Sequence, residues 1–240
     1  MKTRLTLLFA IAAGLSHSVN AETSLTYELV DAQGATKEQI YTLHGRWTRI
    51  DNATVSKQKH FILDTGFMIM HVVDSEKSVF STFGESHFHQ GKQEQTAADV
   101  ATAKQAAERE GKVPTLKPTG NKDTVAGIRC NIVNEIENEK PVAEHCMASA
   151  SALGMSQREM ITMARLVDFS RQWTDPDWIA TQSNEQFVSI RSRTAGGSAT
   201  FQLKSVSHLI PPSDYFRVPA GYQKLDTAAD DHAGLITGMK

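Results

Sequence analysis

The sequence predicts an α+β protein built mainly on an antiparallel sheet. Short segments of alternating apolar and polar residues, separated by turn residues, recur over residues 22–84 and again over residues 123–210. Residues 93–110 and the segment that begins at Ser156 instead have helical composition or helical apolar spacing. Because short turns join most of the strands, neighbouring strands are expected to pair antiparallel in chain order.

Residues 1–21 have the features of a Sec-type signal peptide. Lys2 and Arg4 supply a positive start, an apolar run covers residues 5–15, and Ala21 has the small side chain that signal peptidase requires. The run is shorter than the roughly 20 residues of a spanning helix. No cysteine lies near the cleavage point to carry an acyl chain. We therefore expect cleavage after Ala21 and a periplasmic protein that does not span the membrane.

Six strands are expected in the first part of the mature chain. They cover residues 25–30, 37–43, 46–51, 59–63, 67–73 and 78–83. Turn residues lie between them, and Asp64-Thr65-Gly66 is a good hairpin signal. The six strands should form an antiparallel meander.

Two helices are expected. Residues 93–110 contain six alanines and neither glycine nor proline, so they favour a helix with a weakly apolar face. Residues 112–122 follow as a linker within the domain. The second helix should begin at Ser156, because Ser156 and Glu159 have the spacing of a capping box. Its apolar stripe should lie on a face of the sheet, with Arg158, Thr162, Arg165 and Asp168 facing away.

Further strands are expected in the second half of the chain. They cover residues 123–130, 131–136, 142–148, 185–193 and 198–210. Pro211-Pro212 should end the last strand, and residues 226–240 should form a flexible tail. A chain of this length and pattern favours one large domain, which we place at residues 22–225.

The charge balance argues against nucleic acid as a partner. Removing residues 1–21 takes Lys2 and Arg4 away, which leaves 23 basic residues against 27 acidic ones and a net charge of −4. A nucleic-acid-binding domain would instead be basic. An acidic protein is not attracted to anionic lipid headgroups either, so any lipid contact should involve apolar surface.

The mature chain has two cysteines, Cys130 and Cys146. In an exported protein such a pair is most simply a disulfide. The alternative is a redox or metal-binding pair, but the chain has no Cys-x-x-Cys, and His145 beside Cys146 lacks a second spaced ligand. We expect a structural disulfide that joins neighbouring strands or the ends of a hairpin.

No catalytic motif is evident, so the chain is not expected to be an enzyme. A nucleophile elbow, a His-Glu-x-x-His helix and a phosphate loop are all missing from the sequence. His87 and His89, with Met68, Met70 and His71 nearby in sequence, are the candidates for a copper site. Residues 68 and 70 share a strand face whereas His71 points to the other face, so neither a metal nor another cofactor is expected.

Three sequence blocks carry a family resemblance. They are Gly45–Asp51 with the following 61–66 and 70–74 segments, VAGIRC at 125–130 with EHCMA at 144–148, and FRVPAGY at 216–222. Together they resemble the LolA/LolB-like superfamily of periplasmic lipoprotein carriers and receptors. They are most similar to an uncharacterised family within it that has paired cysteines and a closing F-x-x-P-x-G-Y.

The resemblance implies an open, strongly curved antiparallel half-barrel with helices covering its concave face. In the carriers this concavity shelters acyl chains, and an arginine near the first block holds the lid; Arg46 and Arg49 bracket that position here. The residues that could line such a cavity, or else pack in an ordinary core, are Trp47, Phe61, Ile62, Phe67, Ile69, Phe80 and Phe83.

Three functions follow as hypotheses. The first is a binding module that shelters an apolar small molecule, a lipid or an acylated protein segment, driven by burial of apolar area. The second is an interaction or accessory protein that fills its own concavity and binds another envelope protein. The third is a metal binder through His87 and His89.

Overall fold

The computed structural model describes residues 22–30, 34–52, 58–84, 114–174, 186–194, 197 and 200–225. The predictions that fall outside these residues are the signal peptide at 1–21, the helix at 93–110, the tail at 226–240, and the candidate metal ligands His87 and His89.

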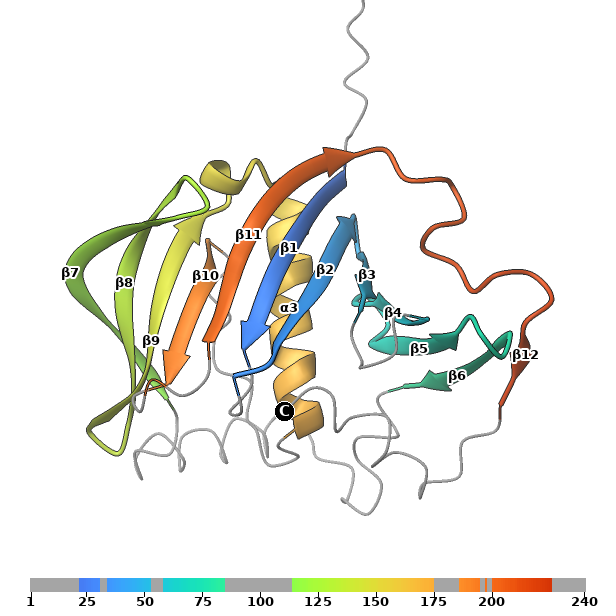
Figure 1. Ribbon diagram of the computed structural model, residues 1–240, viewed down its shortest axis with the longest axis horizontal. Coiled ribbons are helices and arrows are strands. Elements are labelled where there is room, and N and C mark those ends of the chain that lie inside the picture. Colours follow the sequence, from blue (N-terminus) through green and yellow to red (C-terminus); the bar gives the residue numbers. More distant parts are fainter. Residues whose placement is uncertain are drawn as a thin grey trace, which may run out of the picture.

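The described residues form a 12-stranded sheet, one α-helix and one short 3-10 helix (Figure 1). The strands are β1 Glu22–Val30, β2 Thr36–His44, β3 Trp47–Asp51, β4 Lys59–Asp64, β5 Ile69–Asp74, β6 Val79–Phe83, β7 Thr115–Val125, β8 Ile128–Glu137, β9 Lys140–Ser149, β10 Phe187–Thr194, β11 Thr200–Leu209 and β12 Gln223–Lys224. The helices are η1 Ser151–Leu153 and α3 Gln157–Thr174.

The strand order across the sheet is β12-β6-β5-β4-β3-β2-β1-β11-β10-β9-β8-β7. Strands β1 to β6 are neighbours in chain order and pair antiparallel, so the predicted six-strand meander is confirmed. The short edge strand β12 instead pairs parallel with β6.

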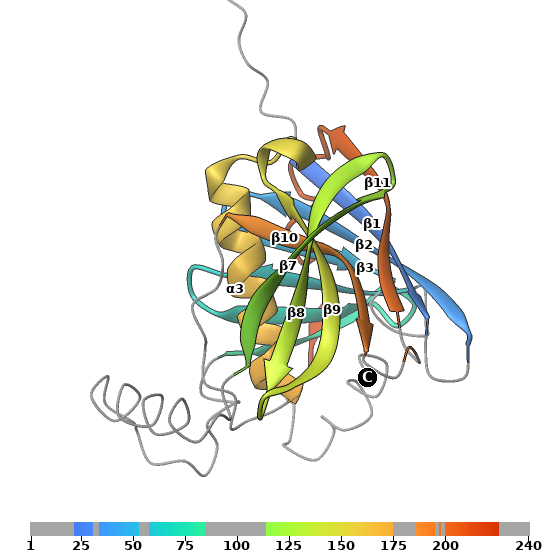
Figure 2. The same cartoon turned by 90° about the vertical axis from the view of Figure 1, so that its left-hand side faces the viewer.

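The sheet is open and strongly curved, and α3 lies along its inner side (Figures 1 and 2). We call this side of the sheet the helix face and the opposite side the outer face. The main core lies between the helix face and α3. Its larger sheet members are Leu25, Tyr27, Leu43, Ile50, Phe61, Leu63, Met70, Val72 and Phe83, and those of α3 are Met160, Met163, Leu166 and Phe169.

Helix α3 begins with the predicted capping box, which is confirmed. The Ser156 N–H donates to Oε2 of Glu159 at 2.7 Å, and the Glu159 N–H donates back to Oγ of Ser156 at 3.3 Å. The other carboxylate oxygen of Glu159 accepts the N–H of Thr23 on β1 at 2.9 Å. One buried carboxylate therefore both starts the helix and joins it to the sheet.

Replacing Glu159 by alanine is expected to lower the free energy of unfolding by about 1–2 kcal/mol, since it removes a cap and leaves buried N–H groups unpaired. Urea unfolding of the mature protein would measure the loss. Gln157→Ala, at an exposed position in the same first turn that takes no part in these bonds, is the control and should change stability by less than about 0.5 kcal/mol. Equal losses in the two variants would contradict the double role of Glu159.

The expected α+β class, with several helices covering the concave face, is wrong. Within the described residues a single sheet dominates, and α3 is the one α-helix. Part of the error is that residues 112–122, expected as a linker, largely belong to β7. That strand is exposed from Thr115 to Thr124, so it lacks the apolar alternation by which a strand is recognised. The predicted strand 123–130 is also broken, by a turn at Ala126-Gly127 where both residues have positive φ.

The other part of the error concerns what covers the outer face. Residues 210–225, which we call the C-terminal strap, cross the outer side of β2 and β3 and end beside β6. Phe216 stacks on His44 of β2 with ring centres 5.5 Å apart, and the Gln223 N–H donates to the carbonyl of Ser78. The strap contains the FRVPAGY block, and it is an irregular segment with only the short strand β12.

Candidate functional site

The seven residues predicted to line an apolar cavity are divided between the two faces of β3–β6. Cross-strand partners in a sheet point to the same side, so the strand register assigns each residue to a face. Phe61 and Phe83 lie on the helix face and belong to the main core. The residues on the outer face are Trp47, Ile62, Ile69 and Phe80. Phe67 is in the β4–β5 turn and is 63% exposed.

On the helix face, side chains of α3 pack directly against the predicted lining residues. Phe61 and Phe83 are 3% and 0% exposed, and Met160 and Phe169 of the helix are 1% and 4% exposed. These four belong to one continuous cluster of buried side chains. Both predicted lining residues on this face are thus in contact with the protein's own core.

On the outer face, the arginine at position 49 holds the strap. The Arg49 guanidinium lies 4.2 Å from the ring centre of Tyr215 and donates to the Tyr215 carbonyl at 3.1 Å. It also pairs with Asp51 at 2.9 Å, and Asp51 in turn accepts the Tyr215 hydroxyl at 2.7 Å. The lid arginine implied by the family resemblance therefore contacts the C-terminal strap here when it is Arg49.

Beside this contact lies His60, an outer-face residue of β4 that is 6% exposed. Its Nε2 atom is buried and has no hydrogen-bond partner among the residues that the structure describes. Burial, and then the nearby charge of Arg49, lowers the pKa of His60 to about 4, although the carboxylate of Asp51 acts in the opposite direction. His60 is therefore a neutral, buried group at neutral pH.

Arg46 lies at the end of the sheet where the β2–β3 and β4–β5 turns are adjacent. Its guanidinium is 4.6 Å from the ring centre of Phe67 and 5.3 Å from that of Trp47. It also forms an ion pair with Asp64 at 3.1 Å. Half of the Arg46 side chain and most of Phe67 remain exposed, so the cluster faces solvent.

The β4–β5 turn is held in one conformation by Asp64, which is 3% exposed. Its Oδ1 atom accepts the N–H of Gly66 at 2.9 Å and that of Phe67 at 3.3 Å. Gly66 has no room for a side chain, since an added Cβ would come within 2.9 Å of the Arg46 side chain. The exposed Phe67 is thereby fixed relative to Arg46.

Helix α3 contributes two more arginines to this end of the sheet. Arg165 donates to the carbonyl of Thr65 at 3.2 Å, and the side chain of Arg158 lies against Gly45. Between them Thr162 donates to the Gly45 carbonyl and is 2% exposed, so the prediction that Thr162 faces away from the sheet is wrong. We call the set Arg46, Trp47, Phe67, Arg158 and Arg165 the tip surface.

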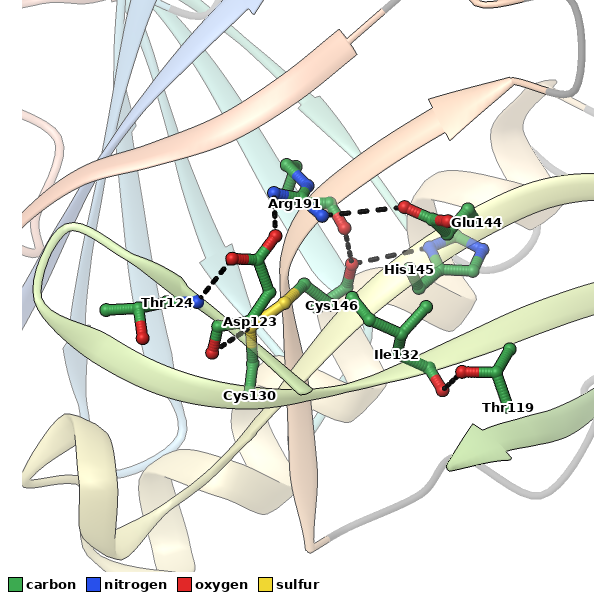
Figure 3. The surroundings of a disulfide bond; sticks show 10 residues. Thr119, Asp123, Thr124, Cys130, Ile132, Glu144, His145, Cys146 and Arg191 are labelled. Atoms are coloured by element: carbon green, nitrogen blue, oxygen red, sulfur yellow. Dashed lines mark hydrogen bonds and ion pairs between the residues drawn. A yellow bond between two sulfur atoms is a disulfide. The ribbon is translucent and has the colours of Figure 1, made fainter. Parts of the chain in front are cut away.

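The predicted disulfide between Cys130 and Cys146 is confirmed and joins β8 to β9 (Figure 3). Beside it Arg191 of β10, 8% exposed, donates to Asp123 at 2.7 Å and to Glu144 at 3.4 Å. The pKa of the Asp123 carboxyl is held below its ordinary value first by the Thr124 N–H and then by Arg191. Four adjacent strands are thus cross-linked in one place.

One arrangement on β8–β10 resembles a nucleophile, base and acid. His145 Nε2 is 2.8 Å from Glu135 Oε2, and its Nδ1 is 3.3 Å from Ser189 Oγ. However, the Ser189 hydroxyl donates its single proton to the carbonyl of Arg191 at 3.1 Å. His145 therefore does not receive that proton, and the geometry is that of a hydrogen-bonded network between strands.

The described part of the chain offers neither a metal site nor a spanning helix. No group of three His, Cys, Asp or Glu side chains in it has the proximity that a metal ion requires. Met70 lies on the helix face and His71 on the outer face, where His71 Nδ1 is 3.0 Å from the Thr82 hydroxyl. None of the helices in the described ranges is both long and apolar enough to cross a membrane.

Comparison with known proteins assigns no family. No family model matches the chain, and no curated protein matches it either. Three solved structures share some similarity. An uncharacterized conserved protein from Thermus thermophilus has a TM-score of 0.47 at 6% identity, over 86% of this chain and 91% of that one. PNGF-II has a TM-score of 0.44 at 10% identity, over 90% of this chain and 32% of that one.

The third is the Pseudomonas aeruginosa MucA/MucB complex, with a TM-score of 0.42 at 9% identity over 86% of this chain. The chain spans 59% of the matched chain in that complex and so covers less than two thirds of it. At such scores and identities the likeness carries no argument about function. The resemblance to LolA/LolB-like proteins stays a prediction.

Proposed function

We propose that this chain is an exported binding module of the bacterial envelope that recognises a protein partner without covalent chemistry. The observation that carries the proposal is the filled helix face. Met160, Met163, Leu166 and Phe169 of α3 are each at most 7% exposed and pack with the sheet residues of the same core. An acyl chain could enter this region only by displacing α3, which would expose all of that apolar area to water.

The tip surface supports recognition of a protein. Arginine and aromatic side chains are the residues that most often contribute large shares of binding energy in protein interfaces. Phe67 is 63% exposed and is held in place by Arg46 and the Asp64-bonded turn. A fixed aromatic side chain loses little conformational entropy when it binds, which favours affinity.

The alternative function is the carriage of an apolar ligand such as a lipid, an acyl chain or an acylated protein segment. It is supported by Trp47, Ile69 and Phe80, which are partly exposed on the outer face. Ile62 and Val73 are fully buried on that face. Movement of the strap would join these residues into one apolar surface, which would bind ligands by the burial of area.

Native mass spectrometry of the mature protein, purified gently from periplasm and then extracted with solvent, separates the two functions. A mass without cargo, no uptake of a fluorescent fatty acid, and a discrete cross-linked partner from a photoreactive residue placed at Phe67 would support the proposal. A co-purifying lipid that the fluorescent fatty acid displaces would instead support the carrier function and overturn it.

A further inference from the structure

The described residues leave the charges at the tip surface unbalanced. Arg158 and Arg165 are both exposed, and within the described residues neither forms an ion pair with a carboxylate. The acid in this cluster, Asp64, is 3% exposed and already bonded to Arg46 and two backbone N–H groups. A positively charged surface thus occurs on a chain with a net charge of −2.

The positions of these arginines suit an extended peptide. Arg158 and Arg165 are seven residues apart on α3, which places them two turns apart, about 10 Å along one side of the helix. An extended chain advances about 3.3 Å per residue, so carboxylates three residues apart on a partner would span this distance. Each guanidinium can bind a carboxylate through two parallel hydrogen bonds.

Phe67 adds an apolar contact beside the arginines. Its ring is 63% exposed, and Arg46 packs over it at 4.6 Å. An inorganic anion would make no use of this ring. An anionic bilayer would be repelled by the net negative charge of the chain as a whole and would meet only one well-exposed aromatic side chain among the described residues. A protein segment that carries both acids and an apolar side chain uses all of these features.

We infer that the tip surface binds an acidic segment of the protein partner, with its carboxylates on Arg158 and Arg165 and an apolar side chain on Phe67. The inference rests on the proposed function, because it names the surface and the chemistry by which the partner is recognised. Attraction between the arginines and an acidic segment should also raise the association rate, and the effect should weaken as salt is added.

The test uses the mature protein and a fluorescent nine-residue peptide of glutamate and aspartate around one central leucine. Its uncharged counterpart has glutamine and asparagine at the acidic positions. Binding is measured by fluorescence anisotropy at low and at moderate salt. The acidic peptide should bind more tightly than the uncharged one, and Arg158→Gln/Arg165→Gln should weaken its binding by about tenfold at low salt.

Two further variants keep this test sharp. Arg158→Gln alone alters an exposed residue without an ion pair among the described residues, so it should keep the fold and still weaken binding by a few-fold. Lys117→Gln/Lys122→Gln removes the same number of charges from β7, at the opposite edge of the sheet from β3–β5, and should bind like the wild type. Phe67→Ala should weaken both peptides, because it removes the apolar contact.

Equal binding of the two peptides, or equal weakening by the β7 variant, would overturn the inference. So would binding of phosphatidylglycerol vesicles without binding of the acidic peptide. If the partner captured in the periplasm binds the Arg158→Gln/Arg165→Gln variant as well as the wild type, the tip assignment fails while the proposed function stands. If the protein carries a lipid and captures no partner, the proposed function itself fails.

Discussion

Replacing Cys130 and Cys146 together by alanine is expected to lower the free energy of unfolding by about 3 kcal/mol. The two cysteines are 16 residues apart, and a loop of this length gives roughly that stabilisation in the chain-entropy model of disulfides. For a protein of this size the loss corresponds to about 6–12 °C in melting temperature. Alanine suits the test because both cysteines are buried, at 4% and 0% exposure, where a serine hydroxyl would need a partner.

Reduction of the wild type is the matched control for this variant. Urea unfolding in the presence of a reductant should lower the stability of the wild type by a similar amount and leave the double alanine variant unchanged. If the reductant has no effect on the wild type at equilibrium, the cross-link is not the source of the stability. The variant would then report only the loss of buried sulfur atoms.

The position of the disulfide explains why its loss should affect more than one hairpin. Arg191 of β10 lies beside the bond and pairs with Asp123 of β7 and Glu144 of β9 (Figure 3). The β7 edge strand is exposed along ten of its residues and contributes a single buried side chain, Val125. Few apolar contacts hold it, so its attachment depends on β8, the disulfide and this arginine.

Local sequence signals predicted the elements that local chemistry controls. The six-strand meander follows from alternation and turn residues, and the start of α3 follows from Ser156 and Glu159, which bond to one another within one turn. The disulfide followed from the presence of only two cysteines in an exported chain. Each of these signals is contained within a few residues or in the composition.

The features that were missed depend on contacts between distant residues. Arg165 meets Thr65 across 100 positions of sequence, and Arg49 meets Tyr215 across 166. No periodicity in either segment indicates such a meeting. The strap is the clearest case: Phe216 is 9% exposed although its segment has no regular alternation. Its FRVPAGY block contributed to a family resemblance but indicated no structural role.

The candidate site shows the same division. Apolar residues of both parities in β3–β6 predicted that both faces of this part of the sheet are covered, and both are: one by α3 and one, at β2, β3 and β6, by the strap. Which face was available for a ligand could not be read from parity, because parity assigns residues to sides without saying what covers each side. The tip surface required the positions of two turns and a helix together.

Acidification is expected to destabilise the protein through His60. In the unfolded chain a histidine has an ordinary pKa near 6.5, whereas burial and Arg49 lower the pKa of His60 to about 4 in the folded protein. Between these values the unfolded state binds more protons than the folded state, so stability falls as pH decreases. The contribution is complete above pH 6.5 and is lost progressively as the pH falls through 4. By pH 5 it amounts to a loss of about 2 kcal/mol.

His60→Phe tests this prediction, because it keeps an aromatic ring of similar size and removes both the titration and the unpaired Nε2 atom. Stability is measured by urea unfolding at pH 7 and pH 5 for wild type and variant. The wild type should lose about 2 kcal/mol more than the variant over this interval, since other acid-sensitive groups are common to both proteins. In NMR spectra the His60 ring signal, identified by its absence from the variant, should stay in the neutral position down to about pH 5. A ring that titrates near pH 6.5, or equal losses in both proteins, would mean that the outer face beneath the strap admits water to His60.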